Sequence, residues 1–439
     1  MKNYEEIKKN LSKGWNTWNN RSVLSHVLLP EGLCINLCFK QHNWIDEKYL
    51  KHSLIGRWQK GSEVVKPYLH TCDGSYTELE IKWENVHAKV QSAHIDNDLV
   101  ILVTPLNEFD GKAPSKLIIE SGILWNQPAK NIEIFTTIEK EDEDPFVDCL
   151  TPYFSVFFTK ETGVSTGKKR TAEEIKKIIE DKKENVLAEI RSKYKDLSDT
   201  YIAIQSVLAW NTIYDPKGKR VISTVGRLWN EEYGGYCLFG WDNFFLSYML
   251  SIDNKELSFS NIIEHLKSAN EEGFISNDYR GNGTRSWDRS QPPVGSIMVK
   301  EIYEKYPEKW FLEMTYEPLL KWNEWYFENR MNQGLLSYGS HVAEKNLYNE
   351  PHIATLRTAR FESGMDDSPM YTESVFNSDK NVLELQDVGL NSLYLADCEA
   401  LIEIAKILGK DFSEIEKRKL TILSKFQSLW SDEYKMYLN

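Results

Sequence analysis

Two adjacent aspartates, Asp366 and Asp367, lie in the turn-rich stretch FESGMDDSPMY, residues 361–371. Gly, Ser, Asp and Pro are the residues that turns use, so a solvated loop is one interpretation, and a helix-capping pair is another. Phe361 and Tyr371 flank the pair, however, and a carboxyl group among apolar side chains keeps its proton to a higher pH. Successive side chains point in different directions. One aspartate could therefore donate a proton, as glycosidic cleavage requires, while the other braces the turn.

A Trp-Asp pair and a glutamine are the next candidates for chemistry. Trp241 and Asp242 follow two glycines in GGYCLFGWDNFF, at the predicted start of a helix. Asp242 could accept hydrogen bonds from the free N–H groups of that helix, or it could bind the hydroxyls of a sugar that packs on Trp241. The loop NDYRGNGTRSWDRSQPP contains Trp287 and Gln291, whose amide both donates and accepts hydrogen bonds. An ordinary surface loop is the alternative for this stretch.

Composition favours a neutral, polar substrate. Fourteen Trp, 22 Tyr and 18 Phe make up 12% of the 439 residues, and many stand beside Asp, Asn or Arg. An aromatic face beside a hydrogen-bonding group suits a sugar, although large cores also use aromatic residues. The formal net charge of −13 argues against nucleic acid or an anionic membrane as a partner, because both bind basic surfaces.

Cysteine usage and the N-terminus predict a cytoplasmic protein. The six cysteines are scattered without a CxxC pair, so free buried thiols are expected in place of a metal site or disulfides. No cofactor or metal is expected. The first residues, MKNYEEIKKNLSKGWNTW, are charged and lack the apolar core of a signal peptide. No apolar stretch reaches the length that a membrane span needs.

Two patterns of hydrophobicity divide the chain. In YTELEIKWENV, Leu79, Ile81 and Trp83 alternate with charged residues, which is typical of a half-buried strand. Similar stretches follow without helices between them: DLVILVTP, KLIIES, NIEIFTTI and YFSVFFT. This spacing predicts an antiparallel β-sandwich over residues 1–165.

From residue 166 onward the apolar period becomes helical. Thr171 and Glu174 form a predicted capping box at the start of a linker helix in residues 166–196. Gly409 is expected to end one helix, and Asp411 to start the next. Residues 197–439 form the predicted helical domain, with helices near 198–214, 241–251, 256–270, 294–306, 308–330, 383–408 and 411–430.

Five motifs in this order resemble glycoside hydrolase family 63 and its bacterial mannosylglycerate hydrolase-like relatives. They are NTIYDPKGKRVISTVGRLWN, GGYCLFGWDNFF, SQPPVGS, ESGMDDSPMY and DVGLNSLYLADCEALIEIAKILGK. The stretch KGWNTWNNRSVLSHVLLPEG looks like the start of the N-terminal sandwich in one bacterial branch. The resemblance covers roughly residues 197–437 and implies an (α/α)6 toroid behind the β-sandwich.

The resemblance also implies roles for individual residues. The first aspartate after Glu-Ser-Gly-X is the family's general acid, which points to Asp366, with Asp367 in support. Trp241, Asp242 and Gln291 would bind the sugar that is released. The other expected substrate-binding residues are Phe239, Trp287 and Tyr371. The implied reaction is hydrolysis of a small α-glucoside or α-mannoside with inversion.

One departure from the family's pattern concerns the second carboxylate. The family's general base is a glutamate in a Glu-Asn-Tyr-like stretch that follows a Tyr-Trp-Arg-Gly segment, and neither stretch exists in this sequence. Only seven or eight helices are predicted from residue 197, whereas the toroid has twelve, and Trp430, Tyr434 and Tyr437 lack a later element to cover them. We therefore expect the toroid to be incomplete, the base to lie beyond residue 439, and this chain alone to be inactive.

Two other functions remain open on the sequence. A sugar-binding, non-catalytic relative would keep the pocket without a base. An epimerase or lyase on a similar toroid would rely on paired histidines or tyrosines, whereas the nine histidines here are dispersed.

Overall fold

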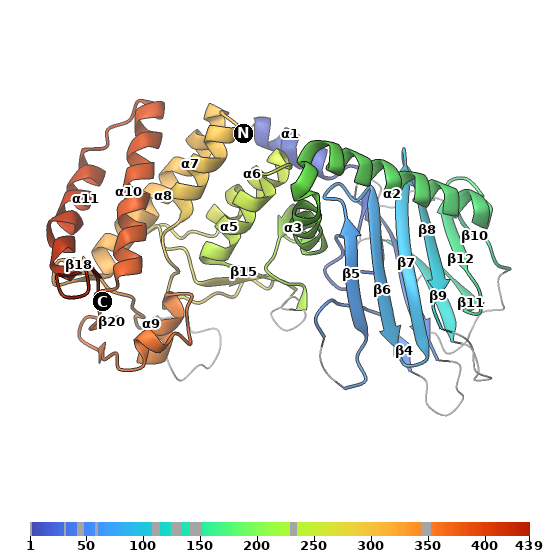
Figure 1. Cartoon of the computed structure of the whole chain (residues 1–439), viewed down its shortest axis with the longest axis horizontal. Helices are drawn as coiled ribbons and strands as arrows, with labels where there is room; N and C mark the ends of the chain where they lie inside the picture. Colours follow the sequence, from blue (N-terminus) through green and yellow to red (C-terminus); the bar gives the residue numbers. More distant parts are fainter. Residues whose placement is uncertain are drawn as a thin grey trace. The chain divides into compact units, whose positions relative to one another are not determined.

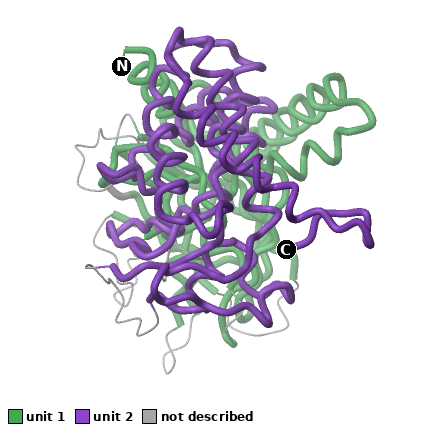
Figure 2. Tube along the Cα trace, turned by 90° about the vertical axis from the view of Figure 1, so that its left-hand side faces the viewer, with its two compact units in different colours: residues 1–235 green, residues 236–439 purple. Residues whose placement is uncertain are grey.

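In the computed structural model, the protein forms two compact units, residues 1–235 and 236–439 (Figures 1 and 2). The structure describes residues 2–29, 32–41, 48–57, 60–107, 115–123, 133–139, 152–228, 235–343 and 353–439. The first unit is mostly β-sheet and the second is mostly helical.

Two antiparallel sheets form the body of the first unit. One has the order β1 (Trp15–Asn16), β2 (Ser25–Leu28), β3 (Leu33–Lys40), β9 (Lys116–Ile123) and β11 (Tyr153–Phe157), with β4 (Tyr49–Leu50) paired to β3. The other has the order β10 (Ile134–Thr136), β12 (Thr162–Thr166), β8 (Asp98–Pro105), β7 (Val86–Ile95), β6 (Tyr76–Trp83) and β5 (Val64–His70). All the pairings that join these strands are antiparallel.

The sandwich expected from the alternating pattern is confirmed. Leu37 and Phe39 of β3 lie in the same buried cluster as Ile81 and Trp83 of β6, so the two sheets share one apolar core. Along β6, Leu79, Ile81 and Trp83 are buried, and Lys82 between them is exposed. Side chains that alternate in this way place every second residue in the core.

Helices α1 (Lys2–Leu11), α2 (Ala172–Tyr194) and α3 (Ser198–Trp210) complete the first unit, with β13 (Thr212–Asp215) and β14 (Arg220–Ser223). The predicted capping box of Thr171 and Glu174 starts α2. Ile175 and Ile179 of α2 pack with residues of the second sheet, and Figure 1 shows α2 lying across that sheet. The helix expected as a linker thus covers a sheet face. The boundaries at residues 165 and 196 stay a prediction.

The second unit contains three helical hairpins within its described residues. These are α5 (Gly240–Leu250) with α6 (Lys255–Leu266), α7 (Gly295–Lys305) with α8 (Lys309–Asn329), and α10 (Val388–Leu408) with α11 (Ser413–Phe426). The first helices of successive hairpins touch, since α5 packs on α7 and α7 on α10, while α6 packs on α8. Hairpins repeated in this way are the arrangement of an (α/α)6 toroid, present here in part.

Local side chains explain where these helices begin and end. Asp387 accepts a hydrogen bond from the Leu390 amide and caps α10, so this helix starts five residues later than the predicted position 383. Gly409, with φ of 70°, ends α10 as expected. Helix α3 ends at Trp210, short of the predicted position 214, because Thr212–Asp215 pairs with Arg220–Ser223.

Elements that the sequence pattern did not predict lie in the loops of the second unit. The short helix α9 (Leu356–Glu362) precedes the two adjacent aspartates. Four two-stranded sheets also occur among the described residues of this unit: β15 (Cys237–Phe239) with β16 (Asp278–Arg280), β17 (Met331–Asn332) with β18 (Leu335–Leu336), β19 (Phe376–Asn377) with β20 (Val382–Leu383), and β21 (Trp430–Ser431) with β22 (Met436–Tyr437). In the last hairpin, Tyr437 packs on Phe426 and Trp430, whereas Tyr434 is exposed.

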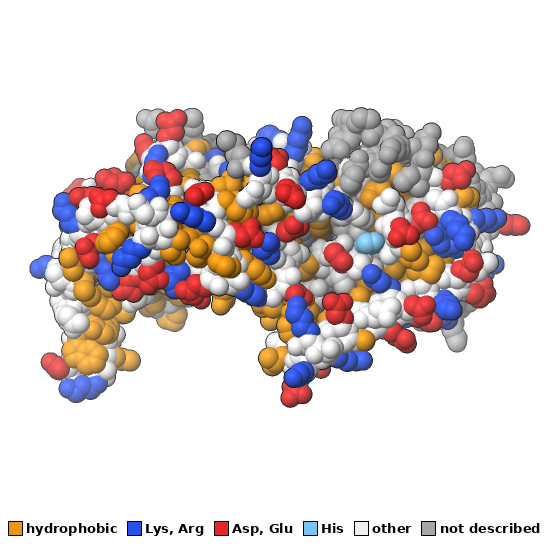
Figure 3. All heavy atoms as spheres, turned by 90° about the horizontal axis from the view of Figure 1, so that it is seen from above, with side chains coloured by type: hydrophobic (Ala, Val, Ile, Leu, Met, Phe, Trp, Pro, Cys, Tyr) orange, Lys and Arg blue, Asp and Glu red, His pale blue; other side chains and the backbone are white. Residues whose placement is uncertain are grey.

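The surface and the cysteines agree with the composition. On the face that Figure 3 shows, acidic and basic side chains are interspersed. Among the described residues, no helix is both long enough and apolar enough to cross a membrane. Cys34, Cys38, Cys72, Cys237 and Cys398 are free thiols, of which Cys38, Cys237 and Cys398 are buried, and Cys149 lies outside the described residues.

Candidate active site

The Trp-Asp pair lies at the start of α5, directly after strand β15. Trp241 donates its backbone N–H to Oε1 of Gln291 over 2.9 Å, so the loop that contains Gln291 is tied to the helix start. Gly240 makes this approach possible, because a Cβ there would lie 2.9 Å from Cβ of Gln291. Phe239 occupies the cap position of α5, so capping of this helix does not fall to Asp242, which lies in its first turn.

The turn with the two aspartates touches the same helix start. Gly364 has φ of +67°, and a Cβ at this position would lie 2.6 Å from the indole ring of Trp241. Only a glycine allows the backbone so close to the ring in this conformation. Two residues further on, Asp366 is exposed, as is Asp367. The contact between Gly364 and Trp241 therefore brings Asp366 near Asp242, and the two carboxyl groups interact electrostatically.

Both of these carboxyl groups hold their protons more tightly than usual. Desolvation raises the pKa of Asp242, and the charge of Asp366 raises it further, while hydrogen bonds from its own backbone and the Trp241 and Gln291 side chains oppose the rise. Local desolvation also raises the pKa of Asp366, and the Asp367 charge adds to it. The nearby guanidinium groups of Arg289 and Arg360 lower the pKa of Asp366 again, without cancelling the rise. A raised pKa is the property that a general acid needs near neutral pH.

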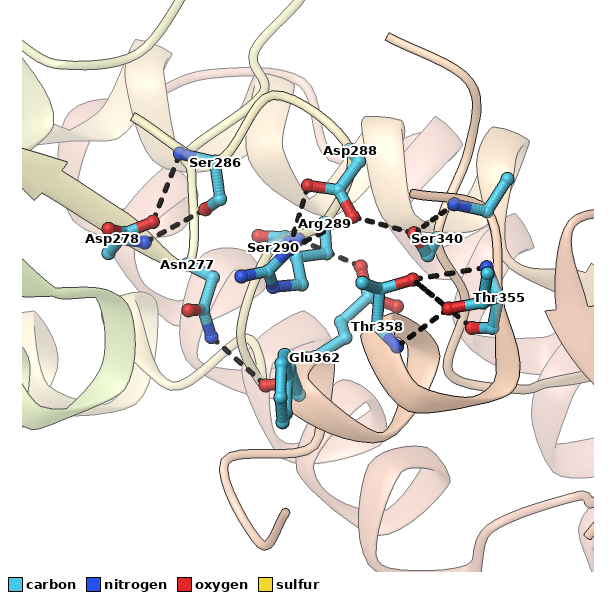
Figure 4. A network of polar contacts seen from close by, with 12 residues as sticks. Asn277, Asp278, Ser286, Asp288, Arg289, Ser290, Ser340, Thr355, Thr358 and Glu362 are labelled. Carbon is cyan, nitrogen blue, oxygen red and sulfur yellow. Dashed lines mark hydrogen bonds and ion pairs between the residues drawn. The ribbon is translucent and has the colours of Figure 1, made fainter. Parts of the chain in front are cut away.

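A network of buried polar groups supports the loop before Gln291 (Figure 4). Asp288 accepts hydrogen bonds from Arg289 Nη1 at 2.9 Å and from Ser340 Oγ at 2.6 Å. Arg289 lies over the ring of Phe361, 5.1 Å from its centroid, and Asn277 donates to the Phe361 carbonyl. The loop of residues 286–291 and the helix that precedes Asp366 are therefore joined by polar and aromatic contacts.

Two of the expected substrate-binding residues are engaged elsewhere. Tyr371 is fully buried and donates its hydroxyl to Asp387 Oδ2 over 3.1 Å, with a raised pKa caused first by desolvation. Trp287 is half-buried, stacks on Phe274 and lies beneath the guanidinium of Arg285. A sugar contact by these two side chains stays a prediction. The structure brings together Trp241, Asp242 and Gln291 with the turn that contains Asp366 and Asp367, while Phe239 ends the adjoining strand β15.

Sequence reasoning did not single out a buried carboxylate that contacts the loop before Gln291. Glu362 is completely buried and forms an ion pair with Arg330, 2.6 Å between Oε2 and Nε. Its position four residues before Asp366 was visible in the sequence, but its partner lies 32 residues earlier in the chain. No group of three or more His, Cys, Asp or Glu that could hold a metal ion occurs among the described residues.

Residues 241–439, a little under half of the chain, match a family model of glycoside hydrolase domains. The family is the mannosylglycerate hydrolase MGH1-like glycoside hydrolase domain. The resemblance inferred from the five motifs is therefore confirmed over this part of the chain. No curated protein matches the chain.

Several solved structures are similar to the chain at low sequence identity. A GH63 mannosylglycerate hydrolase from Thermus thermophilus, in complex with glucose, is 19% identical over 46% of this chain and 59% of its own, with a TM-score of 0.37. A bacterial glucoamylase complexed with acarbose is 10% identical over 95% of this chain and 67% of its own, with a TM-score of 0.46. The chain spans 58% to 61% of the length of four Thermus thermophilus structures among those that it matches.

Proposed function

We propose that the protein is an α-glycosidase that hydrolyses a small α-glucoside or α-mannoside with inversion. The observation that carries the proposal is the placement of Asp366, whose turn packs through Gly364 on Trp241 beside Asp242 and Gln291. The match of residues 241–439 to a glycoside hydrolase family supports it. A small carbohydrate is the proposed partner of this site, and no cofactor takes part in the proposed reaction.

In the proposed mechanism Asp366 is the general acid. Its raised pKa keeps a proton available for the oxygen of the leaving group. Trp241 offers an aromatic face to the sugar ring, while Asp242 and Gln291 hydrogen-bond to its hydroxyls. Asp367 is the supporting residue, since its negative charge raises the pKa of Asp366.

An inverting reaction also needs a general base that activates water. The two carboxyl groups of inverting enzymes lie about 6.5–9.5 Å apart, with the water between the base and the sugar. The family's base belongs to a stretch that has no counterpart in this sequence. This departure favours one second candidate, a sugar-binding relative that does not turn its ligand over.

Product stereochemistry tests the proposal. The protein is incubated with α-linked disaccharides of glucose and mannose and with mannosylglycerate, and the first anomer released is followed by proton NMR. For any glycoside that is turned over, the proposal expects the β-anomer first. Release of the α-anomer would exclude inversion, and binding without any product would favour the second candidate.

A further inference from the structure

Glu362 connects four chain segments through one carboxylate. Its Oε1 accepts hydrogen bonds from the Ser290 amide at 2.8 Å and from Arg330 Nη2 at 2.7 Å. Its Oε2 accepts from the Gly339 amide and from Arg330 Nε, both at 2.6 Å. The side chain of Glu362 is fully buried, so these four donors replace the water that the charge has lost.

The partners of Glu362 are themselves fixed. The Arg330 guanidinium lies over the ring of Trp325, 4.7 Å from its centroid, and Arg330 is 1% exposed. Gly339 can approach because it has no side chain, since a Cβ there would lie 3.0 Å from Nε of Arg330. The carboxylate thus sits in a rigid frame made by the end of α8 and the loop that follows.

Two of the four segments are those of the candidate active site. Ser290 directly precedes Gln291, which accepts from the Trp241 amide. Glu362 is the last residue of α9 and lies four residues before Asp366. Figure 4 shows Glu362, at the end of α9, beside the loop that contains Ser290. A movement of this carboxylate would therefore change the spacing between Gln291 and Asp366.

A second buried carboxylate holds the other end of α9. Asp288 accepts from Ser340 Oγ, and Ser340 Oγ in turn accepts from the amide of Ala354. Ala354 precedes Thr355, whose side chain caps α9. Hydrogen bonds therefore hold α9 at both ends, through Ser340 before its first residue and through Glu362 at its last.

We propose that Glu362, in its ion pair with Arg330, is a positioning residue that sets the distance and orientation of Asp366 relative to Gln291. Glu362 is buried and touches no substrate, so it acts through the two segments that it joins. The proposal rests on the proposed function, since it gives that site its geometry. A site displaced by a fraction of an ångström loses affinity and rate.

Three variants distinguish an effect of Glu362 on the position of Asp366 from an effect on the stability of the fold. Glu362→Gln keeps the shape of the side chain and removes the charge. Arg330→Met combined with Glu362→Gln removes both charges, so no unpaired cation is left in the interior. Glu264→Gln is the matched control, because Glu264 is a buried carboxylate of α6 that pairs with a different cation, Lys267.

Two properties are measured on each variant beside the thermal unfolding midpoint. One is the affinity for methyl α-D-mannoside and methyl α-D-glucoside, measured by NMR titration. The other is the titration midpoint of the Asp366 carboxyl, followed by ¹³C NMR with Asp366→Asn to assign the signal. The charged groups that act on this carboxyl are Asp242, Asp367, Arg289 and Arg360. This second measurement does not depend on sugar binding.

The proposal expects Glu362→Gln to weaken glycoside affinity by about tenfold or more and to move the Asp366 midpoint toward its ordinary value. The double variant is expected to regain the unfolding midpoint of the unaltered protein. Its glycoside affinity and its Asp366 titration midpoint should remain changed. Glu264→Gln should leave affinity and the Asp366 midpoint unchanged.

Two results would overturn the proposal: an unchanged Asp366 midpoint in Glu362→Gln, or recovery of both properties in the double variant. If the unaltered protein binds neither glycoside, the proposed function fails, while the Asp366 midpoint still decides whether Glu362 positions the turn.

Discussion

The β-sandwich and the loops of the helical unit are stabilised in different ways. In the sandwich, strands from two sheets bury one apolar cluster in which Ile101 and Ile119 are completely buried. In the helical unit, the loops around Asp366 are held by buried charges: Asp288 with Arg289, and Glu362 with Arg330. An apolar core tolerates small changes of shape, whereas a buried ion pair fails as soon as one partner is removed. The loops of the candidate site are therefore held in place by a few polar contacts.

The largest expected effect comes from breaking the central ion pair. Arg330→Met leaves the carboxylate of Glu362 buried without its cation, so we expect the free energy of unfolding to fall by about 3–5 kcal/mol. Denaturant titration checks this. A loss no larger than that of a single core truncation in the sandwich would remove the contrast between the two regions.

A fall in pH should change the stability of the two units in opposite directions. Burial lowers the pKa of His26 to about 4 and that of His70 to about 3, from 6.5. Below pH 6.5 the unfolded chain binds these protons and the folded sandwich does not, so its stability falls as the pH falls toward 4. In the helical unit, burial raises the pKa of Asp397 from 3.8 to about 6. The folded state binds this proton first, so the contribution of Asp397 rises as the pH falls from 6 to 4.

Hydrogen exchange resolved by unit, recorded between pH 7 and pH 4 and corrected for intrinsic rates, measures this difference. The shift at Asp397 corresponds to at most about 3 kcal/mol. Asp397→Asn should flatten the pH dependence of the helical unit and leave that of the sandwich unchanged. Equal slopes in both units before and after this substitution would contradict the assignment.

A comparison of two glycines separates the cost of crowding Trp241 from the cost of backbone strain. Gly364 and Gly409 have nearly the same positive φ, +67° and +70°, but a Cβ at Gly409 would meet nothing within 4 Å. Gly409→Ala is expected to cost about 1 kcal/mol from strain, and Gly364→Ala about 1–2 kcal/mol more from the collision with Trp241. Denaturant titration of both variants gives the difference. Equal losses would mean that the indole moves aside without cost.

The smallest expected effect lies in the sandwich. Ile119→Val removes one methylene from the apolar cluster, so we expect a loss of about 1 kcal/mol in the free energy of unfolding. Affinity for an α-glycoside should not change. A change in that affinity would show that the sandwich core influences the site.

The fold could be predicted further from the sequence than the site. Alternation along β6 and the capping box at Thr171 are local signals, and the structure contains both elements. The short hairpins and α9 escaped prediction, because two-residue strands and a seven-residue helix leave too few positions for a period to show.

In the candidate site, too, residues in a recognisable motif could be predicted, and residues joined only by the fold could not. Asp242, Gln291 and Asp366 were predicted because they stand in motifs that resemble those of a known family, and their roles stay a prediction. The ion pair of Glu362 with Arg330 was not found, because no local pattern indicates which arginine meets a given glutamate. The burial of Tyr371 and its hydrogen bond to Asp387 were likewise not indicated by its position in the motif, and its sugar contact stays a prediction.

One substitution tests the central claim most directly, because Asp366→Asn keeps the shape of the side chain and removes its ability to act as an acid. Turnover of the best α-glycoside and its dissociation constant are measured in parallel, with Asp367→Asn as the neighbouring control. We expect Asp366→Asn to lower turnover by about 10²–10⁴-fold with affinity nearly unchanged, and Asp367→Asn to have a smaller effect. Full turnover by the Asp366→Asn protein would contradict the assignment of Asp366 as the general acid.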